Sequence, residues 1–271
     1  MKIDVAESFI DGVETFEIVA KIQNQILSAT DSNIEIFLSD GKLFYNRVGV
    51  FLLACLTAFA TQYEKSIKFH FNVSSSVWDK SNPASYFQLE TKEDVIQLVS
   101  ENISGQIPIQ MSENFKEILV SLIGEVYNNA VEHSERKYTI GSCHNEDNDI
   151  SRLCFSCYDT GIGIIENVRR YFGKEFDGKF HDYDISRKLL RWALQKGHST
   201  KAGSRGLGID MLLEFARLNS GNVRICNENV LFEQNAHGEI KYQKLDDKFQ
   251  GLFFEMHIVE DPKAIYKLKG E

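Results

Sequence analysis

The sequence predicts two parts of different fold class: an α/β module at the N-terminus and an α+β sandwich from about residue 108 onward. In the first part, two strand patterns flank a long apolar helix pattern, which is the order of a β-α-β unit. In the second part, two amphipathic helix patterns occur among strands joined by short polar turns, which is typical of helices packed on an antiparallel-rich sheet. A serine run at 74–76 and Ser81-Asn82-Pro83 mark a loop between the two.

The N-terminal part starts with apolar residues at helical spacing over 14–28, followed by a strand over 33–38. An apolar run from Val48 to Ala60 comes next, and its 13 residues are too few to cross about 30 Å of bilayer hydrocarbon. We therefore expect a buried helix there. Residues 67–73 alternate between apolar and polar side chains, as a half-buried strand does. These elements predict a parallel or mixed sheet in a module that spans residues 1–90.

A helical connector is predicted over residues 91–107, because Thr91 is followed three residues later by Asp94, which is typical of a capped helix start. The second part is assigned to residues 108–271. Its predicted elements are a helix over 115–131, a hairpin with strands over 138–144 and 150–158, a helix over 206–219, and short strands over 223–226, 239–245 and 252–258.

The overall negative charge argues against nucleic acid and anionic membranes as partners. The chain has 271 residues, of which 30 are basic and 39 acidic, giving a net charge of −9. Such a chain has no overall attraction to nucleic acid or to anionic lipid, so neither nucleic acid nor a membrane is expected as a partner. Acidic residues among the first seven interrupt the apolar run that a secretion signal needs, and the five cysteines are an odd number. We therefore expect reduced thiols and a cytoplasmic location.

Two of the cysteines, Cys154 and Cys157, form a C-x-x-C sequence with Cys143 and His144 upstream, a combination of residues that zinc sites use. Residues 150–158 alternate as a strand, and a strand directs residues three apart to opposite faces. Ordinary strand cysteines are therefore favoured, and zinc stays the alternative.

A first cluster of residues that could bind a ligand or take part in catalysis lies on the helix over 115–131. Glu125 and Asn129 are one turn apart and therefore share a face. That face adjoins the apolar stripe of the helix, so both groups are expected near the edge of the core. Taken alone, a Glu and an Asn at this spacing are more commonly an exposed polar pair.

A second cluster, Asp159-Thr160-Gly161-Ile162-Gly163, directly follows a predicted strand. The two glycines allow the backbone to approach a flat or charged ligand closely, because they have no Cβ. A carboxylate at a strand end can accept a hydrogen bond from an exocyclic amine such as that of adenine. A loop with an incidental pair of glycines is the alternative.

A third cluster is the glycine-rich segment 203–208, which leads into the helix over 206–219. Unpaired N–H groups and the positive end of the helix dipole favour phosphate oxygens at such a position. The segment lacks the Gly-Lys-Ser/Thr of a Walker A loop, and no strand precedes it as a dinucleotide fingerprint requires. It therefore predicts phosphate binding by neither of these two loops.

In this order and on these elements, the three clusters resemble the boxes of the GHKL ATPase superfamily, whose nucleotide-binding domain has the Bergerat fold. Residues 125–133 resemble the N box, 159–163 the G1 box and 205–208 the G2 box, and the likeness covers about 108–260. The resemblance implies a Bergerat-type sandwich, with helices on a mixed, mostly antiparallel sheet, that binds ATP with Mg²⁺.

The resemblance also implies a role for each matched residue. Asn129 would hold Mg²⁺, Glu125 would activate the attacking water as a general base, and Asp159 would bind the adenine amine. The other implied nucleotide-binding residues are Gly161, Gly163, Ser199, Thr200, Lys201, Arg205, Gly206, Leu207 and Gly208. The sequence departs from the family at Leu252, because many members have a threonine after the glycine that corresponds to Gly251, and that threonine completes their adenine site.

The segment between the second and third boxes is basic, with ten Lys or Arg and five Asp or Glu from Glu166 to Arg205. The family has its mobile ATP lid in this place, and a basic lid suits a ligand with several negative charges. A solvated basic surface is the alternative, and a nucleic-acid patch is a minor third one.

The order of elements in residues 33–73 resembles a STAS-like module, although a generic module for packing or dimerisation explains it equally well. Phosphorylation is not expected there, because Asn46-Arg47-Val48-Gly49 lacks the Ser or Thr that phosphorylated members carry. Three functions stay open: an ATPase-driven switch that acts on a protein partner, a protein kinase of the anti-sigma or histidine kinase-like type, and a nucleotide-gated scaffold without hydrolysis. A homodimer is also left open.

Overall fold

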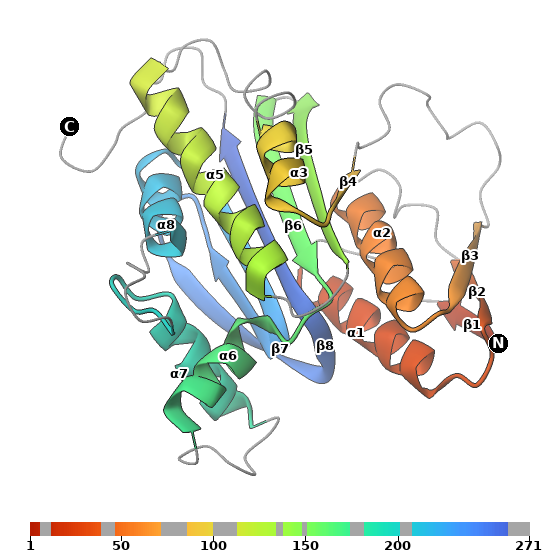
Figure 1. Ribbon diagram of the computed structural model, residues 1–271. Coiled ribbons are helices and arrows are strands. Elements are labelled where there is room, and N and C mark those ends of the chain that lie inside the picture. The colour runs from red at the N-terminus through yellow and green to blue at the C-terminus, as the bar shows by residue number, and fades with distance from the viewer. Residues whose placement is uncertain are drawn as a thin grey trace.

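The computed structural model describes residues 1–5, 12–38, 47–71, 86–99, 113–133, 138–147, 151–173, 182–200 and 208–259. Within these ranges the chain is a mixed α/β protein with seven helices, a parallel three-stranded sheet and an antiparallel five-stranded sheet. Figure 1 shows the small sheet at the right, two helices beside it, and the larger sheet with further helices in front of it.

The small sheet is formed by β1 (Lys2–Val5), β2 (Asn33–Leu38) and β3 (Ser66–Phe71), in that order and all parallel. Two helices connect the strands, α1 (Val13–Ser28) and α2 (Arg47–Gln62). The predicted β-α-β unit is thereby confirmed, and so is the burial of the apolar helix, since Leu52 and Leu56 of α2 are fully buried. The sequence did not predict β1, because four residues are too few for a clear period of two.

Helices α1 and α2 lie between the two sheets, and their apolar side chains form one core with both. Phe16 of α1 contacts the rings of Phe249 and Phe253, with centroid distances of 6.0 and 5.1 Å. Gln23 of α1 donates to the backbone oxygen of Gln250 at 3.1 Å and accepts from its N–H at 2.9 Å. The N-terminal helices are therefore part of the packing of the larger sheet. The division at residues 90 and 107 stays a prediction.

The larger sheet has the strand order β4-β5-β6-β8-β7, and each neighbouring pair is antiparallel. Its strands are β4 (Tyr86–Leu89), β5 (Thr139–Asp147), β6 (Ser151–Asp159), β7 (Asn222–Gln234) and β8 (Ile240–Val259). β5 and β6 confirm the predicted hairpin. Asp159, at the end of β6, is paired with Thr139 on one side and with Leu252 on the other.

The prediction of three short strands at the C-terminal end was wrong, because β7 and β8 are two long strands of 13 and 20 residues. A bulge interrupts their register around Glu228, whose φ angle is 52°. Bulges and charged residues such as Asp246 and Asp247 break the hydropathy pattern without ending the strand. The sequence pattern therefore underestimated the continuity of both strands.

The face of the larger sheet opposite α1 and α2, called the front face below, is covered by α5 (Glu113–His133) and α8 (Gly208–Leu218). These helices confirm the two predicted amphipathic helices within the described residues. Two shorter helices, α6 (Gly163–Phe172) and α7 (Tyr183–Ala193), pack on each other beside them.

The short helix α3 (Lys92–Gln97) starts as the sequence predicts. The N–H of Asp94 donates to the Thr91 hydroxyl at 3.2 Å, and the N–H of Thr91 donates to the Asp94 carboxylate at 2.8 Å. This reciprocal capping box satisfies two donors that the helix itself leaves without partners.

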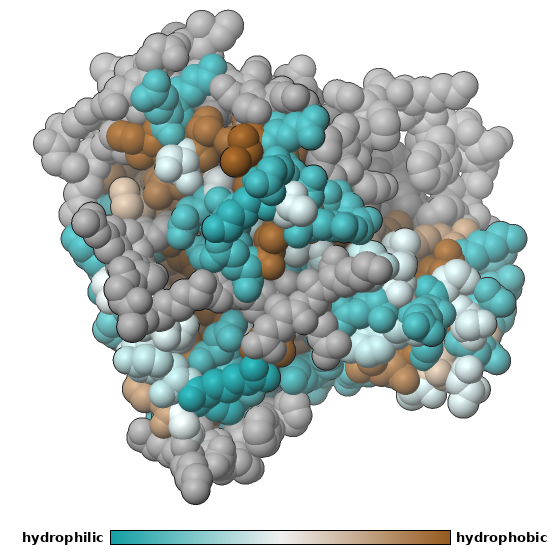
Figure 2. Space-filling view, in the orientation of Figure 1, coloured by the Kyte–Doolittle hydropathy of each residue, from teal (hydrophilic) through white to brown (hydrophobic). Residues whose placement is uncertain are grey.

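The surface in the orientation of Figure 1 is mixed, with apolar residues gathered in the upper left over α5 and α8 and hydrophilic residues predominating in the centre (Figure 2). Met211 of α8 is one of the exposed apolar residues, at 41% of its full exposure. None of the helices in the described part of the chain combines the length and the apolar character needed to cross a membrane.

Candidate functional site

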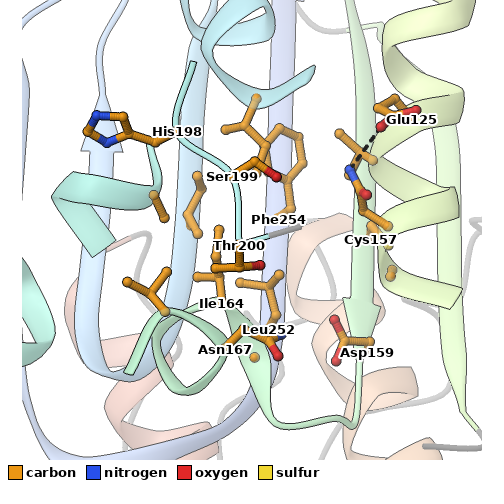
Figure 3. Close-up of a pocket in the computed structure, with 18 of the residues that line it drawn as sticks. Glu125, Cys157, Asp159, Ile164, Asn167, His198, Ser199, Thr200, Leu252 and Phe254 are labelled. Carbon is orange, nitrogen blue, oxygen red and sulfur yellow. Dashed lines mark hydrogen bonds between the residues drawn. The ribbon is translucent and has the colours of Figure 1, made fainter. Parts of the chain in front are cut away.

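A cavity of about 340 Å³ lies on the front face of the larger sheet, enclosed by α5, α6, α8 and the segment after α7 (Figure 3). This volume is in the range of small-molecule sites. Six of the residues predicted from the sequence line it: Glu125, Asn129, Asp159, Gly163, Ser199 and Thr200. The structure therefore brings together residues from three segments that are far apart in the sequence.

The other predicted site residues are placed as follows. Gly161 lies in the loop after β6, and Gly208 is the first residue of α8. Lys201, Arg205, Gly206 and Leu207 lie outside the described residues, so their roles stay predictions.

Glu125 and Asn129 of α5 both line the cavity, and the Asn129 amide donates to the Glu125 carboxylate at 3.5 Å, a bond drawn as the dashed line in Figure 3. Leu122 and Val126, from the apolar stripe of the same helix, also line the cavity. The pair lies at the edge of the core, as the spacing predicts. Its oxygens suit Mg²⁺, which binds proteins through one or two side-chain oxygens and fills its other positions with water or phosphate.

Asp159 is a deeply buried carboxyl group of the cavity, with 3% of its surface exposed. Burial raises its pKa from 3.8 to about 7, and the one backbone hydrogen bond that it accepts, from the N–H of Gly161 at 2.8 Å, only partly opposes this rise. The neighbouring wall is formed by apolar side chains such as Leu252 and Phe254. A carboxylate in such surroundings is stabilised by a ligand N–H, because burial has removed most of its water.

The start of α6, which follows the loop after Asp159, is fastened to β8 through Asn227 of β7, which is 1% exposed. The Asn227 amide donates to the backbone oxygen of Gly251 at 2.7 Å and accepts from the N–H of Ile165 at 2.9 Å. A Cβ atom on Gly163 would lie 2.0 Å from the Asn227 amide nitrogen, and one on Gly251 would lie 2.1 Å from the backbone oxygen of Asp159. Both glycines also have positive φ angles, 75° and 89°. Only glycine fits these two positions without rearrangement.

A buried ion pair attaches α6 and α7 to β7. Arg169 of α6 donates two parallel hydrogen bonds to the Glu228 carboxylate, at 2.8 and 2.9 Å, and the Ser186 hydroxyl of α7 donates to it at 2.8 Å. Burial alone would raise the pKa of Glu228, but the hydrogen bonds and positive charge of Arg169, together with the hydrogen bond from Ser186, lower the pKa overall. Arg169, one of the basic residues in the predicted lid segment, therefore has a structural role: it joins α6 to β7.

The cavity has lining residues that the sequence analysis did not assign to the site. The rings of Trp192 and His198 stack with a centroid distance of 4.5 Å, and Asn167 of α6 lies one turn after Gly163. The stack depends on how the chain turns after α7, which no local pattern reveals. Asn167 could have been predicted from the sequence as a site residue, because it lies four positions after Gly163 and residues four apart on a helix share a face.

The C-x-x-C cysteines are both buried and free of disulfides. Cys157 lines the cavity, and burial raises the pKa of its thiol well above the ordinary value. Strand alternation places Cys154 on the opposite face of β6. Within the described ranges, neither belongs to a group of three or more His, Cys, Asp or Glu side chains arranged to hold a metal ion.

No protein-family model matches the sequence, and a search of curated proteins finds no match either. The function is therefore argued from the geometry and chemistry of the cavity.

Proposed function

We propose that the cavity binds ATP together with Mg²⁺, and that the chain is a nucleotide-binding protein of the GHKL type with a Bergerat fold. One observation carries this proposal. Asn129 on α5, Asp159 at the end of β6 and Thr200 after α7 line the same cavity, although 30 and 41 residues of sequence separate them in turn. The sequence pattern singled out each of these segments for a different part of a nucleotide.

The base is proposed to lie at the end of the cavity formed by Asp159 and Leu252. There the carboxylate accepts a hydrogen bond from the exocyclic amine of adenine, and the apolar wall covers the ring. Guanine has a carbonyl oxygen in place of that amine and would face the carboxylate with like partial charge. We therefore propose that adenine nucleotides bind in preference to guanine nucleotides.

The triphosphate is proposed to extend from the base towards α5 and the segment after α7. The Asn129 amide oxygen would hold Mg²⁺, which neutralises phosphate charge when it is bound, and the Ser199 and Thr200 hydroxyls can donate to phosphate oxygens. Glu125 is one turn away and can accept a proton from water, as a general base must. This placement favours slow or partner-stimulated hydrolysis that resets a conformational switch acting on a protein partner.

Isothermal titration of ATP, with and without Mg²⁺, tests the binding. We expect Asp159→Asn and Asn129→Ala each to weaken binding by about 10- to 100-fold, since each removes a hydrogen bond or ligand contact that involves a charged group. Only Asn129→Ala should also abolish the effect of Mg²⁺. Asp247→Asn, on the opposite side of the sheet, is the matched control and should bind as the wild type does. Absence of ATP binding by the folded wild type would disprove the proposal.

Two assays then distinguish the hydrolysis-driven switch, the protein kinase and the scaffold: release of phosphate from ATP, and transfer of radiolabel from ATP to a protein. For a switch driven by hydrolysis, Glu125→Gln should lower the rate of phosphate release by about 10²- to 10⁴-fold. Label that appears on a co-purified protein would instead favour a kinase. Tight binding without turnover in the presence of a partner would favour a scaffold.

A further inference from the structure

The proposed base site contains one more polar side chain, that of Asn167 on α6. Asn167 lines the cavity together with Asp159 and Leu252, and Figure 3 shows all three at the same end of it. Its amide is partly exposed, and among the described residues it has no hydrogen-bond partner. An amide placed in this way keeps its two donors and its acceptor for a ligand.

The helix that carries Asn167 is held firmly on both sides of it. Ile165 is fully buried and its N–H donates to Asn227, while Arg169 is paired with Glu228. Val168, next to Asn167, is also buried at 1% exposure. Such support orients a side chain before any ligand arrives, which reduces the entropy lost on binding.

The apolar wall beside Asp159 explains why a second polar contact is needed. Leu252 pairs with Asp159 across β6 and β8 and presents only hydrocarbon to the cavity. Adenine has acceptor nitrogens in its ring as well as an amine donor, and Asp159 can satisfy only the donor. A base bound by Asp159 and Leu252 alone would therefore lose hydrogen bonds to water without replacement, which is unfavourable.

We propose that Asn167 is a specificity-determining residue that donates a hydrogen bond from its amide to a ring nitrogen of the adenine whose amine binds Asp159. This inference rests on the proposed function and adds a second recognition point to it. Asn167 thus supplies the hydrogen-bond donor that the hydrocarbon side chain of Leu252 cannot supply.

The test compares ATP with 1-deaza-, 3-deaza- and 7-deaza-ATP, in which one ring nitrogen is replaced by C–H. With the wild type, one of the three analogues should bind about 3- to 10-fold more weakly than ATP, the range expected for one neutral hydrogen bond. With Asn167→Ala, ATP should bind as weakly as that analogue, and the difference between them should vanish. Leu252→Thr in the Asn167→Ala background should recover part of the affinity.

Asn24→Ala, on α1 at the other side of the sheet, is the matched control and should keep the wild-type discrimination. Asn167→Ala should fold, because alanine is favourable in a helix and the amide has no partner among the described residues. If Asn167→Ala weakens ATP and all three analogues equally, or changes nothing, the inference is wrong while ATP binding by the wild type still stands. If the wild type binds no adenine nucleotide, the proposed function itself fails.

Discussion

The two faces of the five-stranded sheet differ in how closely the helices fit against the strands. On the face towards α1 and α2, large side chains such as Phe16 and Phe253 are buried in a continuous apolar core. On the front face, α5 and α8 leave a cavity of about 340 Å³ that contains the buried carboxyl group of Asp159. One sheet thus combines a face that contributes stability with a face that has room and polar groups for a ligand.

The strongest test of this comparison is Asp159→Asn in the absence of nucleotide. The unfolded chain ionises Asp159 near pH 3.8, whereas in the folded chain its pKa is about 7, so the folded protein loses stability as the pH rises between these values. At roughly 1.4 kcal/mol for each pH unit, this loss is on the order of 4 kcal/mol. We expect Asp159→Asn to be more stable than the wild type at pH 7 and above, while it binds ATP less well.

Urea unfolding between pH 5 and pH 8 measures this difference. The advantage of the variant should grow with pH up to about 7 and then stay constant. If the free energy of unfolding of the variant differed from that of the wild type by the same amount at every pH, the raised pKa of Asp159 in the folded protein would be contradicted.

The second test removes a large side chain from the opposite face. Phe16→Ala should lower the free energy of unfolding by about 3 kcal/mol, because the ring is fully buried against Phe249 and Phe253. The affinity of the folded fraction for ATP should stay unchanged. Leu252→Ala, on the cavity wall, should show the reverse, with little loss of stability and weaker ATP binding. Equal effects of both variants on affinity would show that the two faces are not separate.

The smallest expected effect concerns a contact that joins the loop after Asp159 to α2. The Thr160 hydroxyl donates to the side chain of Gln62, the last residue of α2. Gln62→Ala should cost about 1 kcal/mol of stability, as a single hydrogen bond does. ATP affinity should stay within twofold of the wild type, because the N–H of Thr160 still donates to the backbone oxygen of Tyr138 at 3.1 Å. A larger change in affinity, measured by titration, would indicate that the N-terminal helices influence the cavity.

The sequence predicted those elements whose side chains repeat clearly, such as β3 with its alternation of apolar and polar residues, and also the helix cap at Thr91. It missed the continuity of β7 and β8, because the bulge at Glu228 places charged residues inside a strand. In the candidate site, Glu125 and Asn129 could be paired because their spacing on one helix fixes their common face.

Other features of the site depend on contacts between distant segments and could not be read from local patterns. The bridge from Asn227 to Gly251 and Ile165 joins two strands and a helix start. The stack of Trp192 on His198 depends on the turn after α7. Spacing within one element predicts a shared face, but it does not predict which other element will meet that face.

The buried group formed by Arg169, Ser186 and Glu228 has a consequence for how this protein can change over evolutionary time. The three residues lie on α6, α7 and β7, so they are inherited as separate positions, yet Arg169 and Ser186 both donate to the same Glu228 carboxylate. Loss of the arginine alone would leave the negative charge of Glu228 buried without its ion-pair partner. Such a variant is destabilised, and selection removes it. Descendants are therefore expected to keep the trio whole or to replace its charged members together.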